Sequence, residues 1–148
     1  MATHAESNFD PLDDLRDAIP RLELVVLFGS MAKGRQGPRS DVDVAVRCTG
    51  DADLDRLYVA LAPRLRSDRL DLVDVRRASP LLMMEIARSG RVLYEKHPGA
   101  FREFQSLASR RYCDTAKLRR AQKRAIELFL ERQGLGASPS PARNAATQ

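Results

Sequence analysis

The pair Gly29–Ser30 is followed, after ten residues, by Asp41–Val42–Asp43. Gly29 and Ser30 come between a buried strand and an expected short helix, where backbone N–H groups can bind phosphate and glycine allows close approach. Asp41 and Asp43 are two positions apart on an expected strand, so their carboxylates point to the same face. These carboxylates repel each other unless a divalent cation such as Mg²⁺ neutralises them and leaves room for phosphate oxygens. The combined pattern predicts a metal site beside a phosphate site.

A third carboxylate on a neighbouring strand would complete a site for two metal ions. The segment Leu70–Val75 offers Asp71 and Asp74. These residues are three apart on an expected strand, so they point to opposite faces and only one of them can join the site. The alternation of side chains does not decide between them, because each shares its face with apolar neighbours.

The elements that position these residues follow from hydrophobic periodicity and from glycine and proline positions. Asp10 followed by Pro11 predicts an N-cap with proline at the first position of the first helix. Another helix is predicted to start at Ser79–Pro80 and to stop at Gly90, with Gly90 at the position just after its end. The predicted strands cover 22–28, 40–48, 70–75 and 92–94, and the predicted helices cover 12–19, 51–65, 81–88 and, as one long helix, 98–132. This order predicts an α/β (α+β) domain with a small mixed β-sheet flanked by helices.

The 148 residues suit one domain, which we expect to span 9–132, with 1–8 and 133–148 as disordered tails. No apolar run approaches the length of a membrane span, and the acidic N-terminus has no secretory signal. The two cysteines, Cys48 and Cys113, are far apart in sequence and lack metal-ligand neighbours, which fits a reducing cytoplasm. We therefore expect a cytoplasmic protein with neither a disulfide scaffold nor a cysteine-rich zinc site.

The net charge of +5 is concentrated near the C-terminal end. Residues 1–100 hold 15 Lys/Arg and 16 Asp/Glu, whereas residues 101–132 hold 9 Lys/Arg and 4 Asp/Glu. The basic segment could meet an acidic partner, or it could be a solvated helix face. Aromatic residues make up 5% of the chain and tryptophan is absent, so a stacking surface for nucleic acid is not expected.

Together these motifs resemble the nucleotidyltransferase superfamily that includes DNA polymerase beta and kanamycin nucleotidyltransferase. The turn Met31–Gly34 and the segments 71–80 (DLVDVRRASP) and 90–95 (GRVLYE) resemble its MNT-type minimal members, the antitoxins of HEPN–MNT toxin–antitoxin pairs. The resemblance covers roughly 24–95. It implies the polymerase beta-like nucleotidyltransferase fold, with a long C-terminal helix in this chain, and it favours Asp71 as the third carboxylate, leaving Asp74 a structural role.

The resemblance also implies an activity, the transfer of AMP from ATP to a hydroxyl with the help of two Mg²⁺ ions. The acceptor would be a tyrosine of a cognate HEPN ribonuclease toxin, which would form a hetero-oligomer with this chain and be neutralised by the modification. Asp41, Asp43 and Asp71 would be catalytic and hold the metal. The nucleotide would be bound by Gly29, Ser30, Lys33 and Ser40.

Other interpretations stay open on the sequence alone. Lys33, Arg35 and Arg39 could contact a triphosphate or could be solvated loop cations. The chain could adenylylate a small molecule, as aminoglycoside-resistance enzymes do, although it offers little material for an acceptor pocket. It could also be an antitoxin that acts by occlusion alone. Nucleic-acid binding has only the basic residues of 102–124 in its favour.

Overall fold

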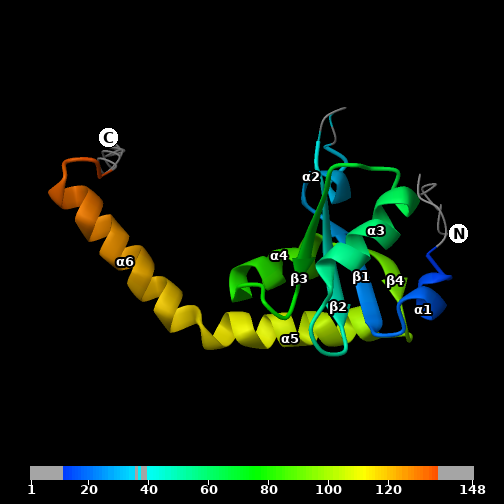
Figure 1. Cartoon of the computed structure of the whole chain (residues 1–148). Coiled ribbons are helices and arrows are strands. Elements are labelled where there is room, and N and C mark those ends of the chain that lie inside the picture. The colour runs from blue at the N-terminus through cyan, green and yellow to red at the C-terminus, as the bar shows by residue number, and fades with distance from the viewer. Residues whose placement is uncertain (1–11, 36, 38–39, 137–148) are drawn as a thin grey trace, which may run out of the picture. The chain divides into compact units, whose positions relative to one another are not determined.

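The structure is a computed structural model that describes residues 12–35, 37 and 40–136. Its chain divides into two compact units, Met1–Tyr112 and Cys113–Gln148, and each is described by itself. Figure 1 shows the sheet and the helices of the first unit. Among the described residues, no helix is both long and apolar enough to cross a membrane.

One four-stranded sheet forms the centre of the first unit, in the order β3-β2-β1-β4. The pairs β1–β2 and β1–β4 are antiparallel, whereas β2–β3 is parallel. Helix α3 connects the two parallel strands, as a parallel pair requires. The strands are β1 Leu22–Phe28, β2 Val42–Cys48, β3 Leu70–Asp74 and β4 Arg91–Glu95. The mixed sheet predicted from the sequence is confirmed, with strand ends shifted by at most two residues.

Helices cover both faces of this sheet. They are α1 Leu15–Ala18, α2 Gly29–Ala32, α3 Leu54–Arg64, α4 Pro80–Ser89 and α5 Ala100–Asp114, and the second unit contains α6 Ala116–Arg132. Helix α4 begins at Pro80, and the Ser79 hydroxyl caps it by accepting a hydrogen bond from the Leu82 N–H at 3.2 Å. This is the arrangement that the cap-plus-proline pattern predicts. The cap predicted at Asp10–Pro11 lies outside the described residues.

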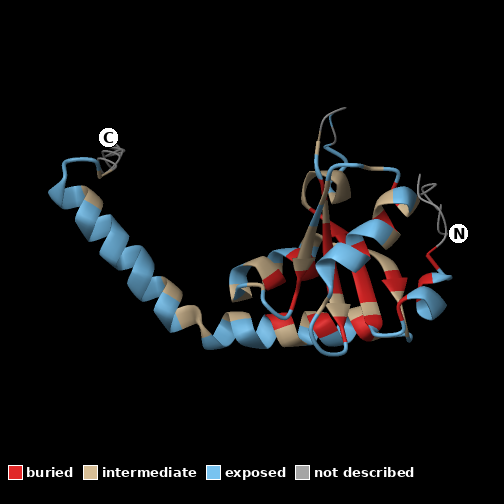
Figure 2. Ribbon diagram, in the orientation of Figure 1, coloured by how far each residue is buried: buried red, intermediate tan, exposed pale blue. Residues whose placement is uncertain are grey.

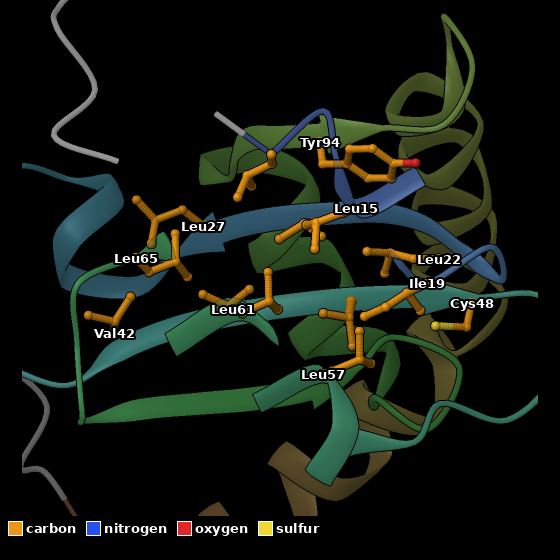
Figure 3. Close-up of a cluster of buried hydrophobic side chains, with 14 residues drawn as sticks. Leu15, Ile19, Leu22, Leu27, Val42, Cys48, Leu57, Leu61, Leu65 and Tyr94 are labelled. Carbon is orange, nitrogen blue, oxygen red and sulfur yellow. The ribbon is translucent and has the colours of Figure 1, made fainter. Parts of the chain in front are cut away.

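The apolar side chains form two cores, one on each face of the sheet. The first core joins even-numbered residues of β2, such as Val44, to α1 and α3, and Figure 3 shows it with Leu15, Leu57 and Leu61 pointing into it. The second core joins Ala45 and Val75 to α4 and α5. Burial in the first unit is concentrated in these two layers (Figure 2). The sheet is thus fixed from both sides, and its strand ends are free to carry polar side chains.

Two details differ from the sequence prediction. The helix predicted over 98–132 is two helices, because α5 ends at Asp114 and α6 begins after Thr115. Gly90 ends α4 in an extended conformation, with φ −70° and ψ 145°, rather than in a left-handed one. A Cβ at Gly90 would lie 2.3 Å from the Ile86 carbonyl oxygen and 2.5 Å from Val26 Cγ1, so the glycine is required by packing.

Candidate active site

Asp43 lies at the centre of a carboxylate group at one end of the sheet. In the strand register it is opposite Asp71 of the parallel strand β3 and opposite Phe28 of the antiparallel strand β1. Side chains of paired positions lie on the same face of a sheet, so Asp43 and Asp71 are neighbours on the face covered by α4 and α5. The register brings together two acids that are 28 positions apart in sequence.

Gly29 touches this group directly. It has φ +71°, a left-handed conformation that glycine adopts without strain. A Cβ added to it would lie 2.2 Å from Asp43 Oδ2, well inside contact distance. The first residue of the short helix α2 is therefore packed against the carboxylate, and no larger side chain fits there unless Asp43 moves. The predicted turn after β1 thus approaches the predicted carboxylates closely.

The electrostatic surroundings of Asp43 are negative. Burial raises its pKa above the ordinary value, and the charges of Asp71, Asp41 and Glu85 raise it further, in that order. Proximity of three other carboxylates is unfavourable in a protein that binds nothing there. This arrangement favours a positively charged ligand.

Asp41 lies just before β2, whose first residue is Val42, and its side chain is exposed. Its Oδ1 is 3.6 Å from the Arg69 Nε. The Val42 N–H donates to the Arg69 carbonyl at 2.8 Å, so the parallel pairing of β2 and β3 continues up to this ion pair. Arg69 precedes Asp71 by two residues just as Asp41 precedes Asp43, which is why the same register brings them together.

The two aspartates of β3 have different environments. Asp71 is exposed beside Asp43, whereas Asp74 is 6% exposed and belongs to the opposite face. Asp74 Oδ1 accepts a hydrogen bond from the Arg76 N–H at 2.9 Å, so it closes the turn that follows β3. The strand register shows which aspartate shares a face with Asp43, which alternation along the sequence could not decide.

The residues predicted to bind nucleotide differ in their exposure and in their present partners. Ser30 follows Gly29 in α2 and is partly exposed. Lys33 Nζ is 3.5 Å from Glu85 Oε1 of α4. The Ser40 hydroxyl accepts a hydrogen bond from the Gly37 N–H at 2.9 Å, which ties it to its own turn. Arg35 is exposed, and Arg39 lies outside the described residues.

The carboxylates fit Mg²⁺ by donor type and by the face they share, since this ion binds hard oxygen ligands and clustered negative charge. They do not yet enclose an ion: within the described part of the chain, no three His, Cys, Asp or Glu side chains form a group that could hold a metal. Asp41 is turned to Arg69 and exposed, so its rotation towards Asp43 would close the set.

A pocket of about 440 Å³ shares Glu85 with this group of acids. Leu81 and Met84 of α4 and Tyr112 of α5 supply its apolar and aromatic surface, and Lys33 and Glu85 contribute charge. Sequence reasoning missed Glu85, because a glutamate on the polar side of an amphipathic helix carries no signal until the helix is docked. Arg69 could have been found once the register of β2 and β3 was known.

Residues 14–99 match the family model described as "Polymerase beta, Nucleotidyltransferase". The chain belongs to this family. The match contains Gly29, Asp43 and Asp71, so the carboxylate group lies within the family domain, and the fold predicted from the sequence is confirmed.

Within the family, the chain is similar to proteins named protein adenylyltransferase MntA. The protein adenylyltransferase MntA of Aphanizomenon flos-aquae (strain 2012/KM1/D3) is 32% identical over 131 residues, which cover 79% of this chain and 86% of the relative. The protein adenylyltransferase MntA of Shewanella oneidensis is 43% identical over 83 residues, which cover 54% of this chain and 59% of the relative.

Solved structures agree with this grouping. A crystal structure of a toxin–antitoxin with AMP-PNP has a chain that is 33% identical to this one, with a TM-score of 0.65 and coverage of 76% of this chain and 91% of that chain. A structure of the tri-AMPylated HEPN toxin of Shewanella oneidensis in complex with its MNT antitoxin is matched at 30% identity, with a TM-score of 0.59 and coverage of 76% and 88%. The resemblance to MNT-type nucleotidyltransferases is thereby confirmed.

Proposed function

We propose that this nucleotidyltransferase transfers AMP from ATP to a hydroxyl of a cognate HEPN toxin and thereby neutralises it. The observation that carries the proposal is the contact of Gly29 with Asp43, with Asp71 opposite, inside the family domain. The relatives named protein adenylyltransferase and the AMPylated toxin in a neighbouring structure support this particular reaction and partner.

Each residue of the site receives a role from its surroundings. Asp41, Asp43 and Asp71 would hold Mg²⁺, which when bound stabilises negative charge on the phosphate oxygens. Ser30 and the backbone N–H groups of the turn after β1 would bind the triphosphate, because glycine at position 29 lets the phosphates approach the backbone. Lys33 would leave Glu85 and pair with phosphate, since the Lys33–Glu85 contact at 3.5 Å is exposed and weak. Ser40 would contribute less to nucleotide binding, because its hydroxyl already accepts a hydrogen bond from the Gly37 N–H.

The reaction forms one bond and breaks one. The acceptor oxygen bonds to the α-phosphorus of ATP, the bond from that phosphorus to the bridging oxygen breaks, and pyrophosphate leaves. The hydroxyl proton passes to Asp71, which is exposed, and then to solvent. The protein contributes chiefly by positioning and by electrostatic stabilisation.

The acceptor in this proposal is a tyrosine, and the chain and the toxin form a hetero-oligomer. Solved structures of a toxin–antitoxin with AMP-PNP and of an AMPylated HEPN toxin with its MNT antitoxin contain chains similar to this one, which supports the hetero-oligomer. Both cysteines are free, Cys48 buried and Cys113 exposed, which fits the reducing cytoplasm as the compartment.

Labelled ATP separates this proposal from its main rival. The chain is incubated with α-labelled ATP, Mg²⁺ and a purified cognate HEPN protein. We expect label on the HEPN protein, loss of its ribonuclease activity, and neither effect when Asp41 and Asp43 are both replaced by Asn. Neutralisation that survives in this variant without any label would show that the chain acts by occlusion.

A further inference from the structure

Helix α6 is amphipathic, and no described residue of its own unit buries its apolar face. Leu118, Ala121, Ala125 and Phe129 follow one another at spacings of three and four residues, and Leu128 lies beside them on the same side of the helix. The exposed fractions are 58% for Leu118, 49% for Leu128 and 61% for Phe129, and no residue of α6 is buried (Figure 2). We call these five residues the α6 apolar face.

Basic residues outnumber acidic ones on α6. The helix contains six Lys/Arg and two Glu in 17 residues. Lys117 and Arg124 border the α6 apolar face, because each precedes one of its members by four residues, and Arg132 follows Leu128 by four. The opposite side carries Arg120, Lys123, Glu127 and Glu131. A helix with this distribution presents an apolar stripe with positive charge along its edges.

We propose that the α6 apolar face docks into an apolar groove of the HEPN partner whose edges carry carboxylates. The inference rests on the proposed function for the identity of the partner, and it adds the surface that holds the partner. A helix of about five turns that buries one face in a groove is a common mode of protein recognition. The positive charges at the edges of the α6 apolar face predict carboxylates at the edges of the partner's groove, because complementary charge guides encounter and suppresses wrong partners.

Two alternative binding partners, a second copy of the chain and a membrane, fit the α6 apolar face less well. A second copy of the helix would bring two basic edges together, and like charges at such an edge oppose association. An anionic membrane would attract the lysines and arginines, but Glu127 and Glu131 lie on the same polar side and would be repelled. The apolar face also contains two alanines, which give little depth for insertion into lipid. A protein groove accommodates both features.

The test compares two pairs of apolar-to-glutamine substitutions in the full chain. Leu118→Gln with Phe129→Gln alters the α6 apolar face, and Leu54→Gln with Val59→Gln alters exposed apolar residues of α3 as the matched control. Affinity for the HEPN protein is measured by titration calorimetry. We expect at least about tenfold weaker binding for the α6 pair and a change below about twofold for the α3 pair, because few interface residues dominate affinity.

Folding and apolar character are controlled with a third variant. Leu118→Met with Phe129→Leu keeps the side chains apolar and helix-favouring, and it should bind within about threefold of the unchanged chain. Circular dichroism of all variants checks that α6 stays helical. AMP transfer at saturating HEPN protein should be retained by the α6 pair, since neither residue belongs to the carboxylate site.

The outcomes separate this inference from the proposed function. Unchanged affinity of the α6 pair, or an equal loss in the α3 pair, would overturn the docking surface while AMP transfer stands. Binding of the unchanged chain without AMP transfer would overturn the enzymatic proposal, and the docking surface would stand if the α6 pair still weakened binding. If the chain alone dimerises, and the α6 pair loses dimerisation with HEPN affinity unchanged, the face would belong to a second copy. If the chain binds phosphatidylserine vesicles, and the α6 pair loses that binding with HEPN affinity unchanged, the face would belong to a membrane.

Discussion

Strand β2 carries charged residues towards both ends, and their surroundings differ. At its C-terminal end Arg47 Nε donates to Glu23 Oε2 at 2.9 Å, and the Thr49 hydroxyl donates to the other oxygen of Glu23, also at 2.9 Å. At its N-terminal end Asp43 lies among acids that raise its pKa. The first end is neutralised by the chain itself and serves stability. At the second end Arg69 pairs with Asp41, and Lys33 pairs with Glu85. Asp43 and Asp71 add further negative charge there that a ligand can neutralise, which is how a binding site differs from a structural ion pair.

The sharpest test of this difference removes charge at the N-terminal end of β2. Asp41→Asn combined with Asp43→Asn should lower AMP transfer by about 1000-fold or more, because metal-assisted charge stabilisation supplies several kcal/mol and each 1.4 kcal/mol is tenfold in rate. Thermal unfolding of the metal-free variant should occur at an unchanged or higher temperature. Because the pKa of Asp43 is raised by folding, its ionised form costs stability at neutral pH, and asparagine removes that cost. Transfer in the double variant within about tenfold of that of the unchanged chain would contradict the site.

The two aspartates of β3 should separate activity from stability. Asp71→Ala should lower transfer by roughly 100-fold or more and leave unfolding unchanged, since Asp71 is exposed and faces Asp43. Asp74→Ala should leave transfer intact and lower the free energy of unfolding by about 1 kcal/mol, because it removes the acceptor for the Arg76 N–H. Both are measured by initial rates and urea unfolding. Equal rates would show that the wrong face of β3 was chosen.

Glycines at the two ends of the β1–β2 pair offer a matched comparison. Gly29 and Gly50 both have positive φ, so replacement by alanine strains the backbone by about 1–2 kcal/mol at either position. Only at Gly29 does the new Cβ meet another group, Asp43 Oδ2; at Gly50 it would find open space. Gly29→Ala should therefore lower transfer by about 10- to 100-fold, and Gly50→Ala should not. Similar rates for both variants would remove the role of the close contact.

At the neutralised end, substitution should affect stability alone. Arg47→Gln leaves the partly buried Glu23 without its charged partner and should lower the free energy of unfolding by about 1 kcal/mol, with transfer unchanged. Arg77→Gln is the control, because its contact with Asp51 at 3.9 Å is exposed and should contribute less than about 0.5 kcal/mol. Chemical denaturation gives both values, and a loss of transfer in Arg47→Gln would contradict the separation of the two ends.

The smallest expected effect is a shift of the pH dependence. Glu85 is the last of the three acids that raise the pKa of Asp43. Glu85→Gln removes this repulsion, so Asp43 loses its proton at lower pH, and the acidic limb of the transfer rate should move to lower pH. Glu127→Gln on α6 should leave the profile in place. A movement to higher pH after Glu85→Gln would mean that Asp43 is not the group that titrates.

Local patterns in the sequence predict most of the sheet. The run Leu22–Phe28 and the Ser79–Pro80 helix start are local signals, and both occur in the structure as predicted. The break at Thr115 carries no proline or glycine, so periodicity over 98–132 favours one continuous helix. The position of Asp71 beside Asp43 depends on the register of a parallel pair, which alternation along one strand cannot determine. The effect of the Glu85 charge on Asp43 requires docking of α4 on the sheet. Interactions between elements were therefore the part that the sequence left open.

The two thiols differ in a way that matters for experiments. Cys48 is buried in the first core, and burial, with Asp74 and Glu23 nearby, raises the pKa of its thiol, so it presents little thiolate to a reagent. Cys113 is exposed where the second unit begins. A maleimide dye should therefore attach once per chain without mutagenesis, at the start of the segment that contains α6. The natural sequence thus supplies a single spectroscopic reporter close to the helix whose partner is sought.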